Sequence, residues 1–275
     1  GRGQLQDFLR SSTRKATVPD TTFADVAGQE NVKREVSELV DFLRDCGELG
    51  VKGLTVDIPH KEDVLRHLAK ADGTVRGIGT ANTLMIEGRE AVGYNSDHRA
   101  FLDALDTVFH ETERGMTLAG RTAMVLGAGG ISKPIVYGLK RRDCEVVISS
   151  RTYERSLLLA EKFRCRTAQW YERSKVEPDI LINATPVGTH PNVDESPMDA
   201  KYLRRGMIVV DTVTNPEQTL LIKEAREQNC RVVTGVEVFA RQSVMQFEHF
   251  TGDKGPIELM KTAMKRAIVP ANWQD

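Results

Sequence analysis

The stretch GLTVDIPHKE, which starts at Gly53, brings a lysine to a place where it could handle a proton. Its apolar and β-branched residues predict a parallel strand over 53–58, and Pro59 ends that strand because proline has no N–H for the ladder. Lys61 then follows the carboxyl end of the strand, where ligands bind in α/β proteins. A lysine in a closed site can serve as a general acid or base. The alternative is an ordinary surface lysine.

The glycine-rich loop VLGAGGISKP is a second chemical feature, because it lies between a predicted strand and a predicted helix. Gly127 allows a tight turn, and Gly129 lets backbone N–H groups approach a pyrophosphate. Gly130 and Ser132 are small enough to keep the helix close to the strand. Together with Ala128, these glycines predict a dinucleotide-binding loop, and the alternative is a purely structural turn.

The end of the next predicted strand, SSRTYER, indicates which dinucleotide binds. An NAD site places an acidic residue there to accept the ribose hydroxyls. This chain instead has the hydrogen-bonding residues Ser150 and Thr152 and the cations Arg151 and Arg155. An arginine fork matches the geometry of a phosphate, so the sequence favours NADP, with its 2′-phosphate, over NAD. The alternative is two solvated surface arginines.

The elements that must position these residues alternate between strand and helix. In the second half of the chain we expect strands at 122–126, 144–150, 166–169, 179–185, 207–213 and 231–235, with helices at 131–140, 153–163 and 217–228. Such alternation is typical of a parallel, doubly wound sheet. Two further helices are expected at 238–250 and 256–267.

The first hundred residues predict a smaller set of elements. Hydrophobic periodicity indicates helices from residue 31 to 44, over 61–70 and over 97–109. Residues 83–94 predict a hairpin with its turn at Glu87, Gly88 and Arg89. The polar residues 1–20 are expected to be loosely ordered.

Bulk composition excludes several classes of protein. The 275 residues include 38 basic and 39 acidic side chains, and a net charge of −1 argues against a nucleic-acid partner. No apolar window is long enough to span a membrane, and no signal peptide is expected at the start. The four cysteines are scattered, which indicates reduced thiols in a cytoplasmic protein and no metal site. We expect a small-molecule substrate and a monomer or homodimer.

Eight short motifs then occur in the order and spacing seen in shikimate dehydrogenases. They are GLTVDIPHK, GTANTL, GYNSD, VLGAGG, SSRT, NATPVG, DTVTNP and GVEVFARQ. The resemblance runs from about Cys46 to the end of the chain. It looks most like the dehydrogenase half of fused dehydroquinase–shikimate dehydrogenases.

The resemblance implies two α/β domains with an active site between them, and reversible hydride transfer between NADPH and 3-dehydroshikimate, which gives shikimate for aromatic amino-acid biosynthesis. It implies that Lys61 and Asp97 form the catalytic pair and that Asn82 and Gln242 bind the substrate. The nicotinamide pocket is implied to include Asn183, Thr185, Pro186, Val213 and Gly235. From the residues alone, Asp97 could be a helix cap, Asn82 a turn residue and Gln242 a solvated side chain.

Three residues depart from the family pattern near these sites. Thr55 and Asp57 stand where the family has Asn and Thr, and Thr214 replaces a tyrosine that contacts substrate or nicotinamide. Asp57 brings a carboxylate close to Lys61, so we expect it either to hold the lysine in a salt bridge or to repel a carboxylate substrate. The lost ring at Thr214 removes packing near the cofactor.

The N-terminal segment departs most from the family pattern. The chain has no Ser-x-Ser-Pro motif, whose hydroxyls bind the shikimate carboxylate in the family. Residues 21–45 instead resemble the segment before the nucleotide site of FtsH-type AAA proteases, but no phosphate loop follows, so no ATPase is implied.

The sequence therefore predicts an α/β protein with two domains. One is an NADP-binding, Rossmann-like doubly wound sheet at 106–250, and the other is a smaller, truncated α/β substrate domain formed by 46–105 and 251–275. Residues 1–45 form an atypical arm and helix. We expect cofactor binding with weak or absent shikimate turnover. The alternative is a non-catalytic relative that binds NADP or a metabolite.

Overall fold

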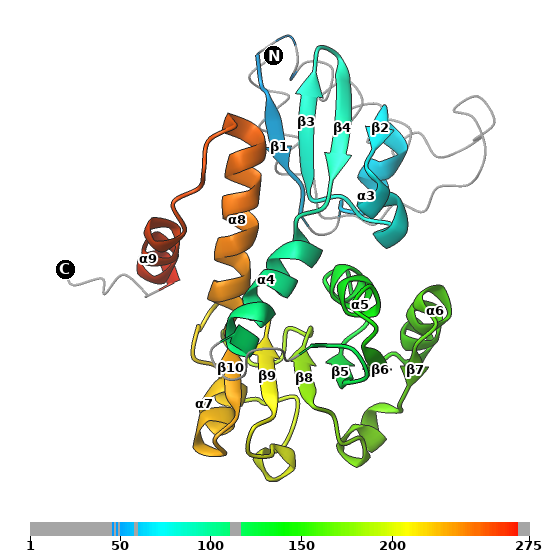
Figure 1. Ribbon diagram of the computed structural model, residues 1–275, viewed down its shortest axis with the longest axis vertical. Coiled ribbons are helices and arrows are strands. Elements are labelled where there is room, and N and C mark those ends of the chain that lie inside the picture. Colours follow the sequence, from blue (N-terminus) through cyan, green and yellow to red (C-terminus); the bar gives the residue numbers. More distant parts are fainter. Residues whose placement is uncertain (1–45, 47, 49, 58–59, 111–116, 269–275) are drawn as a thin grey trace. The chain divides into compact units, whose positions relative to one another are not determined.

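Two β-sheets organise the described part of the chain (Figure 1). The structure is a computed structural model that describes residues 46, 48, 50–57, 60–110 and 117–268. By their contacts these residues form two units, one up to Asn95 and one from Ser96 onward, and each is described by itself. The expected helix at 31–44 and the protease-like segment at 21–45 lie outside the described residues.

The second unit contains the expected doubly wound sheet. All six of its strands are parallel, in the order β10-β9-β8-β5-β6-β7. The strands are β5 (Thr122–Leu126), β6 (Glu145–Ser149), β7 (Arg166–Thr167), β8 (Ile180–Asn183), β9 (Ile208–Asp211) and β10 (Arg231–Val233). The chain runs outward from β5 in one direction and then returns to start again at β8. This reversal creates the crevice between β5 and β8 in which such sheets bind ligands.

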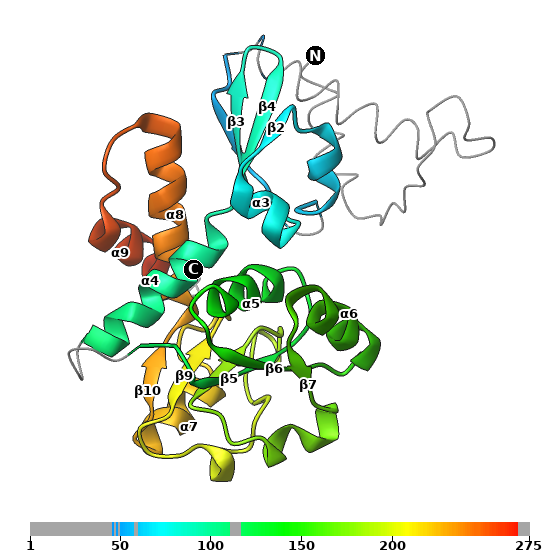
Figure 2. The same cartoon turned by 45° about the vertical axis from the view of Figure 1, so that its right-hand side comes forward.

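Alternating side chains of the strands face two separate cores. In β5, Ala123 and Val125 join one buried cluster, whereas Met124 and Leu126 join the other. Figure 2 shows α5 (Ser132–Lys140) and α6 (Tyr153–Phe163) over one face of the sheet and α7 (Leu220–Glu227) under the opposite face. Short 3₁₀ helices at Trp170–Lys175 and Ala200–Tyr202 complete the connections.

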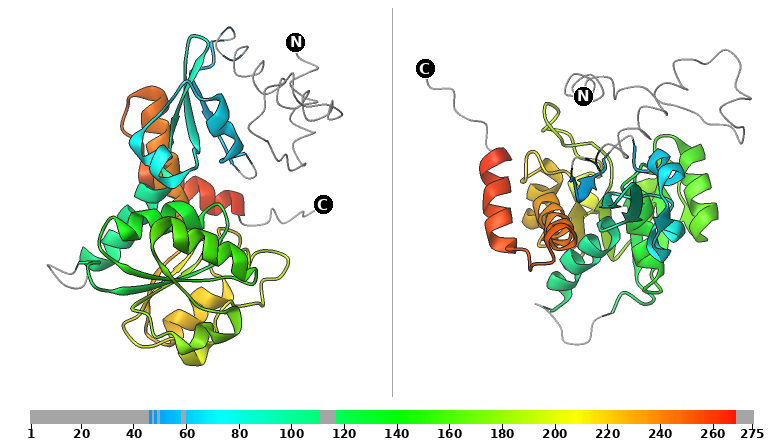
Figure 3. Two further views of the ribbon diagram at one scale, coloured as in Figure 1. Left: turned by 90° about the vertical axis from the view of Figure 1, so that its right-hand side faces the viewer. Right: turned by 90° about the horizontal axis from the view of Figure 1, so that it is seen from above.

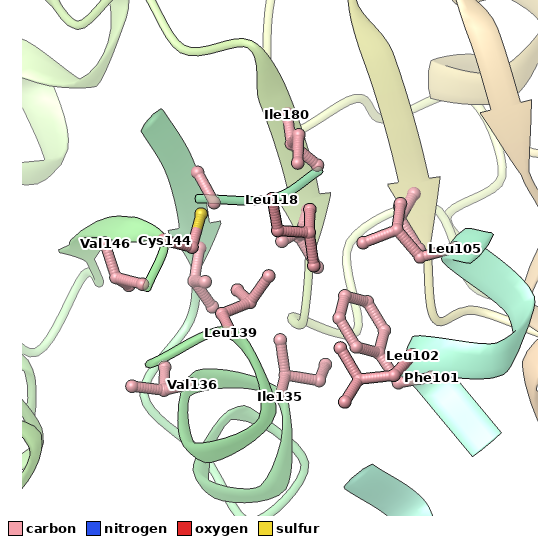
Figure 4. Packing of buried hydrophobic residues seen from close by; sticks show 14 of the residues in the cluster. Phe101, Leu102, Leu105, Leu118, Ile135, Val136, Leu139, Cys144, Val146 and Ile180 are labelled. Carbon is pink, nitrogen blue, oxygen red and sulfur yellow. The ribbon is translucent and has the colours of Figure 1, made fainter. Parts of the chain in front are cut away.

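Helix α4 (Asp97–His110) belongs to the same core as α5. Its residues Phe101, Leu102 and Leu105 point toward Leu139 and Ile180 (Figure 4). A Cβ placed on Gly138 of α5 would lie only 3.2 Å from the Leu102 side chain, so a glycine lets the two helices approach closely. The helix expected at 97–109 is confirmed.

Helices α8 (Gly235–Thr251) and α9 (Ile257–Ile268) end the described chain and lie side by side (Figure 3). The Glu237 carboxylate on α8 joins them, because it lies 2.9 Å from Lys261 Nζ on α9. By contacts, residues 97–105 and α9 therefore group with the nucleotide-type sheet, whereas the sequence assigned 97–105 and 251–275 to the substrate domain. This grouping by contacts does not show which residues bind substrate, so the division into a substrate domain and a cofactor domain stays a proposal.

The first unit has a mixed sheet in the order β1-β3-β4-β2. Strands β3 (Thr83–Glu87) and β4 (Glu90–Tyr94) form the expected hairpin, β1 (Gly53–Thr55) pairs with β3, and β2 (Lys70–Ala71) pairs with β4. Helix α3 (Gly73–Ile78) starts at Asp72, whose carboxylate accepts the Val75 N–H at 2.7 Å. A buried apolar cluster supports this sheet.

Two expectations for this unit were wrong in detail. The strand expected at 53–58 is described only over Gly53–Thr55, and its pairing with β3 is antiparallel rather than parallel. The helix expected at 61–70 is a single 3₁₀ helix, Asp63–His67, because the chain must extend again at Leu68 to enter β2.

Candidate active site

The glycine-rich loop begins at Gly127, which has a backbone conformation that only glycine adopts without strain. Gly127 has a φ of +107°, and a Cβ there would lie 2.6 Å from the Ala184 carbonyl oxygen after β8. Ser132 Oγ donates a 3.0 Å hydrogen bond to the Gly127 carbonyl, which ties the start of α5 to the turn. The loop therefore follows β5 and packs against the first residue after β8, at the reversal in strand order.

Gly129 and Gly130 leave space beside the loop. A Cβ on either glycine would meet no atom of the described residues within 4 Å. The open side at Gly129 agrees with the close approach of a ligand, but the expectation that Gly130 lets helix and strand pack tightly was wrong. Among the described residues no side chain caps the first turn of α5, so this helix start presents N–H groups of the kind that bind phosphate.

The end of β6 carries the predicted cationic side chains. Arg151, Thr152 and Arg155 are exposed, and Ser150 is half-buried, with its Oγ 3.3 Å from the Thr152 N–H. Within the described ranges neither guanidinium takes part in an ion pair. The neighbouring Ser149 Oγ is fully buried and has no hydrogen-bond partner among the described residues. Two exposed cations and hydroxyl groups at this edge suit a phosphate group.

The loops after β8 and β9 are joined by a buried polar network. The Asp211 carboxylate accepts hydrogen bonds from Asn183 Nδ2 at 3.0 Å, from the Val213 N–H at 3.0 Å and from Thr219 Oγ1 at 2.7 Å. Burial raises the pKa of Asp211 to about 6, although its three hydrogen bonds favour the carboxylate. Asn183, Asp211 and Thr219 are each at most 1% exposed, so the network excludes water.

The predicted cofactor residue Asn183 is saturated by contacts within the protein. Its Nδ2 donates to Asp211 and to the Val187 carbonyl, while its Oδ1 accepts from the N–H and the hydroxyl of Thr185. Asn183 thus has no hydrogen-bonding capacity left for a ligand. Its geometry fits a role in holding the loop that contains Pro186.

The start of α8 packs directly against the loop after β9. A Cβ on Gly235 would lie 2.1 Å from the Val213 carbonyl oxygen, so glycine is required there. The predicted residue Gln242 lies two turns later and is half-buried. Beside it, Arg241 pairs with Glu237 at 2.6 Å.

Lys61 is not a surface lysine, because its side chain is only 10% exposed. Its Nζ lies 3.2 Å from Asp57 Oδ1, so the salt bridge expected from this departure is confirmed. The Lys61 carbonyl accepts the Ala81 N–H at 2.8 Å, which places the lysine next to the segment that carries Asn82. Asn82 is fully buried, and its Oδ1 accepts a 2.9 Å hydrogen bond from Thr83 Oγ1.

Asp97 is the first residue of α4 and is 3% exposed. It belongs to the second unit together with Gln242, whereas Lys61 and Asn82 belong to the first. The structure thus brings together the predicted cofactor residues of the sheet edge, and separately Lys61 with Asn82.

The sequence reasoning gave no role to Asp211, Thr219 or the orphaned Ser149. A signal for Asp211 was available, since a carboxylate directly after the buried run MIVV has no access to water and needs partners. Thr219 could have been found as a helix cap before LLIKE. Nothing in the sequence pattern identifies Ser149.

No group of three or more potential metal ligands occurs among the described residues. No helix in this part of the chain is long and apolar enough to cross a membrane.

Two family models match the chain. Residues 25–84 match the shikimate dehydrogenase substrate binding domain, and residues 110–227 match shikimate / quinate 5-dehydrogenase. The first match begins at residue 25, earlier than the start near Cys46 that the motifs indicated. The resemblance of residues 21–45 to AAA proteases stays a prediction.

Curated relatives and solved structures agree with these matches. The chain is 34% identical over 243 residues to the chloroplastic bifunctional 3-dehydroquinate dehydratase/shikimate dehydrogenase of Arabidopsis thaliana, with 84% of this chain and 40% of that protein covered. It is 34% identical to the shikimate dehydrogenase (NADP(+)) of Methanothermobacter thermautotrophicus, covering 80% of this chain and 79% of the relative.

Among solved structures, a Thermus thermophilus shikimate 5-dehydrogenase in complex with NADP(H) and shikimate is 30% identical, with a TM-score of 0.74. The alignment covers 84% of this chain and 85% of that one. The expected fold class, a Rossmann-like parallel sheet with a smaller second sheet, is confirmed. The chain belongs to the shikimate dehydrogenase family of oxidoreductases.

Proposed function

We propose that this protein binds NADP(H) and catalyses the reversible reduction of 3-dehydroshikimate to shikimate. The observation that carries the proposal is the juxtaposition, at one edge of the sheet, of the Gly127 turn, the start of α5 and the exposed Arg151 and Arg155. The chain spans 40% of the fused Arabidopsis relative, so the dehydratase activity in that protein's name is not part of the proposal.

The residues present fit the cofactor. Backbone N–H groups near Gly129 would hold the pyrophosphate, because none of the described side chains fills the space beside that glycine. Arg151 and Arg155 would pair with the 2′-phosphate. Thr185, Pro186, Val213 and Gly235 would line the nicotinamide end, and the network around Asp211 supports their loops. When bound, NADPH supplies the hydride that reduces the ketone carbon.

Lys61 is the proposed proton donor to the ketone oxygen, and in the reverse direction its neutral amine takes the hydroxyl proton. Burial of the side chain supports this role, since water would otherwise compete for the same proton. Asp97 is proposed to orient Lys61, and Asn82 and Gln242 to bind the substrate hydroxyls. The burial of Asp97 and Asn82 favours these roles over an exposed cap and an exposed turn.

A second candidate is a relative that binds NADP or a metabolite without converting it. The Asp57–Lys61 salt bridge favours it, because a carboxylate that already pairs with Lys61 Nζ competes with the substrate oxygen for the same group. Thr214 and the missing Ser-x-Ser-Pro motif favour it as well. Under the leading proposal the same features predict slow turnover, since the serines that would hold the shikimate carboxylate are replaced.

The test is NADP reduction followed by NADPH absorbance, with saturating shikimate at mildly alkaline pH, for the wild-type protein and Lys61→Ala. Turnover that disappears in the variant supports the dehydrogenase with Lys61 as its acid–base group. NADPH binding without turnover in a folded wild-type protein supports the binding relative. Absence of NADPH binding contradicts both candidates. Repeating the assay with quinate in place of shikimate tests which of these two substrates the protein prefers.

A further inference from the structure

A carboxylate outside the proposed chemistry lies at the centre of the cofactor edge. Asp211 is 1% exposed and ends β9, directly opposite Asn183 at the end of β8. One carboxylate oxygen accepts hydrogen bonds from Asn183 Nδ2 and the Val213 N–H, and the other accepts from Thr219 Oγ1. A single side chain thus connects three segments of the sheet edge.

Each of these contacts fixes a different part of the edge. Through Asn183, Asp211 orients the loop after β8, because Asn183 binds both Thr185 and the Val187 carbonyl. Its bond to the Val213 N–H sets the turn after β9, against which Gly235 packs. Thr219 connects the same carboxylate to the start of α7, where its Oγ1 accepts the Ile222 N–H at 3.3 Å.

We infer that Asp211 is a positioning residue that aligns the loops after β8 and β9 for the nicotinamide ring. The inference rests on the proposed NADP site. The adenosine end of the cofactor depends on other residues, namely the loop at Gly127 and the cations after β6, which Asp211 does not contact. Loss of Asp211 should therefore weaken binding of the nicotinamide half while leaving the adenosine half unaffected.

The network also predicts a pH signature. The groups that contact the Asp211 side chain are an amide, a backbone N–H and a hydroxyl, none of which titrates near neutrality. Glu217, in the same loop, instead pairs with Lys265 at 3.2 Å and with Thr234 Oγ1 at 3.3 Å. Burial places the pKa of Asp211 at about 6. Protonation below this pH replaces an acceptor by a donor and should loosen both loops.

The experiment compares two probes by titration calorimetry on the full chain. NADPH uses both halves of the site, whereas adenosine 2′,5′-bisphosphate uses only the adenosine half. For Asp211→Ala we expect the Kd of NADPH to rise about tenfold, because three buried donors lose their acceptor, and the Kd of the bisphosphate to stay unchanged. Asp211→Asn, which keeps an acceptor oxygen, should restore most of the NADPH affinity. Its NADPH affinity should change less between pH 7 and 5 than that of the wild type, and the change that remains reflects titration of the 2′-phosphate, whose second pKa is about 6.

A matched control lies at the opposite edge of the same sheet. Asp179 precedes the neighbouring strand β8, and its Oδ2 accepts the Thr122 N–H at 2.8 Å, so Asp179→Ala removes a carboxylate from the opposite end of the sheet without touching the site. It should leave both affinities unchanged. If Asp211→Ala does not fold, Thr219→Val removes one of the three donors and should raise the NADPH Kd selectively.

Three results would overturn the inference. These are equal losses for both probes in a folded variant, unchanged NADPH affinity in Asp211→Ala and Thr219→Val, and an NADPH affinity whose change between pH 7 and 5 is the same in the wild type and in Asp211→Asn. If wild-type protein binds neither probe, the proposed NADP site fails together with the inference. If the wild type binds both probes, and each probe keeps its wild-type Kd in every variant, the NADP site survives and only the role of Asp211 is lost.

Discussion

Two glycines of the glycine-rich loop should contribute to different properties, Gly127 to stability and Gly129 to cofactor binding. Gly127→Ala should lower the free energy of unfolding by about 2 kcal/mol or more, because a side chain at a φ of +107° is strained and its Cβ would clash with the Ala184 carbonyl. Gly129→Ala should leave stability nearly unchanged but weaken NADPH binding, since its Cβ would occupy the open side of the loop. Urea unfolding and NADPH titration of both variants check this. Equal stability losses would contradict it.

The salt bridge at Lys61 makes a prediction about reaction rate. Asp57 is 78% exposed while Lys61 is 10% exposed, so the pair adds little stability, but its carboxylate lies where it can compete with the ketone oxygen for the lysine Nζ. Asp57→Asn removes this competing charge and should therefore raise the rate of shikimate oxidation by a factor of about two to five, which is what an exposed ion pair is worth. Steady-state kinetics measures the change, and Asp63→Asn, two residues after Lys61, is the control that should leave the rate unchanged.

At the scale of elements, one carboxylate attaches α9 to α8. Burial alone would raise the pKa of Glu237, but hydrogen bonds from Arg241 and Lys261 outweigh burial and lower it. A lowered pKa means that the ion pairs stabilise the fold above the ordinary pKa of glutamate and lose this effect as pH falls through the folded value. The helix pair should therefore weaken in acid.

Glu237→Gln should reduce the free energy of unfolding by about 1–2 kcal/mol at neutral pH, because two cations that are 15% and 16% exposed lose their partner. The difference between variant and wild type should shrink as pH falls below about 4.5. Denaturant unfolding at several pH values measures it. Glu258, which is 82% exposed and contacts the same Lys261 at 3.4 Å, offers the control Glu258→Gln, whose effect should be near zero.

For the whole molecule, a buried thiol can report on opening of the second unit. Cys144 is fully buried, and burial raises the pKa of its thiol to about 11, so the native protein at neutral pH offers almost no thiolate. A thiol reagent should modify Cys144 only as fast as the core opens. NADPH at 100 times its Kd should slow this modification about 100-fold, as peptide mass spectrometry can measure. Modification that NADPH does not slow would place Cys144 in a region that opens without cofactor release.

The nucleotide-type half of the molecule was predictable because its signals are local. Runs of buried apolar residues and glycines fix β5, β6, β8 and β9 to within a residue or two of the expected positions, and the loop at Gly127 follows from them. The first unit was less predictable, because β1 and the 3₁₀ helix after it depend on pairing with the hairpin that follows later in the chain. Long-range pairing of this kind leaves little trace in a short sequence window.

The site shows the same limit. The cationic end of β6 and the Asp57–Lys61 pair were predictable because their members are close in sequence. The Asp211 network was not, because Asn183 and Thr219 approach Asp211 only through the sheet. The role of Gly130 in packing helix against strand was misjudged, since a Cβ there would meet none of the described atoms within 4 Å. The glycine of α5 that permits a close approach is Gly138, and it faces Leu102 of α4 rather than a strand.

The order of the six parallel strands has a consequence for how the protein is made. Taken in the order of synthesis, β6 joins β5, β7 joins β6, and then β8, β9 and β10 add one after another to the other side of β5. Every new strand therefore attaches to an edge that is still open, and no strand has to be inserted between two that are already paired. The second unit can grow outward from β5 while the chain leaves the ribosome, and its last strand, β10, completes the sheet only after residue 233 has emerged.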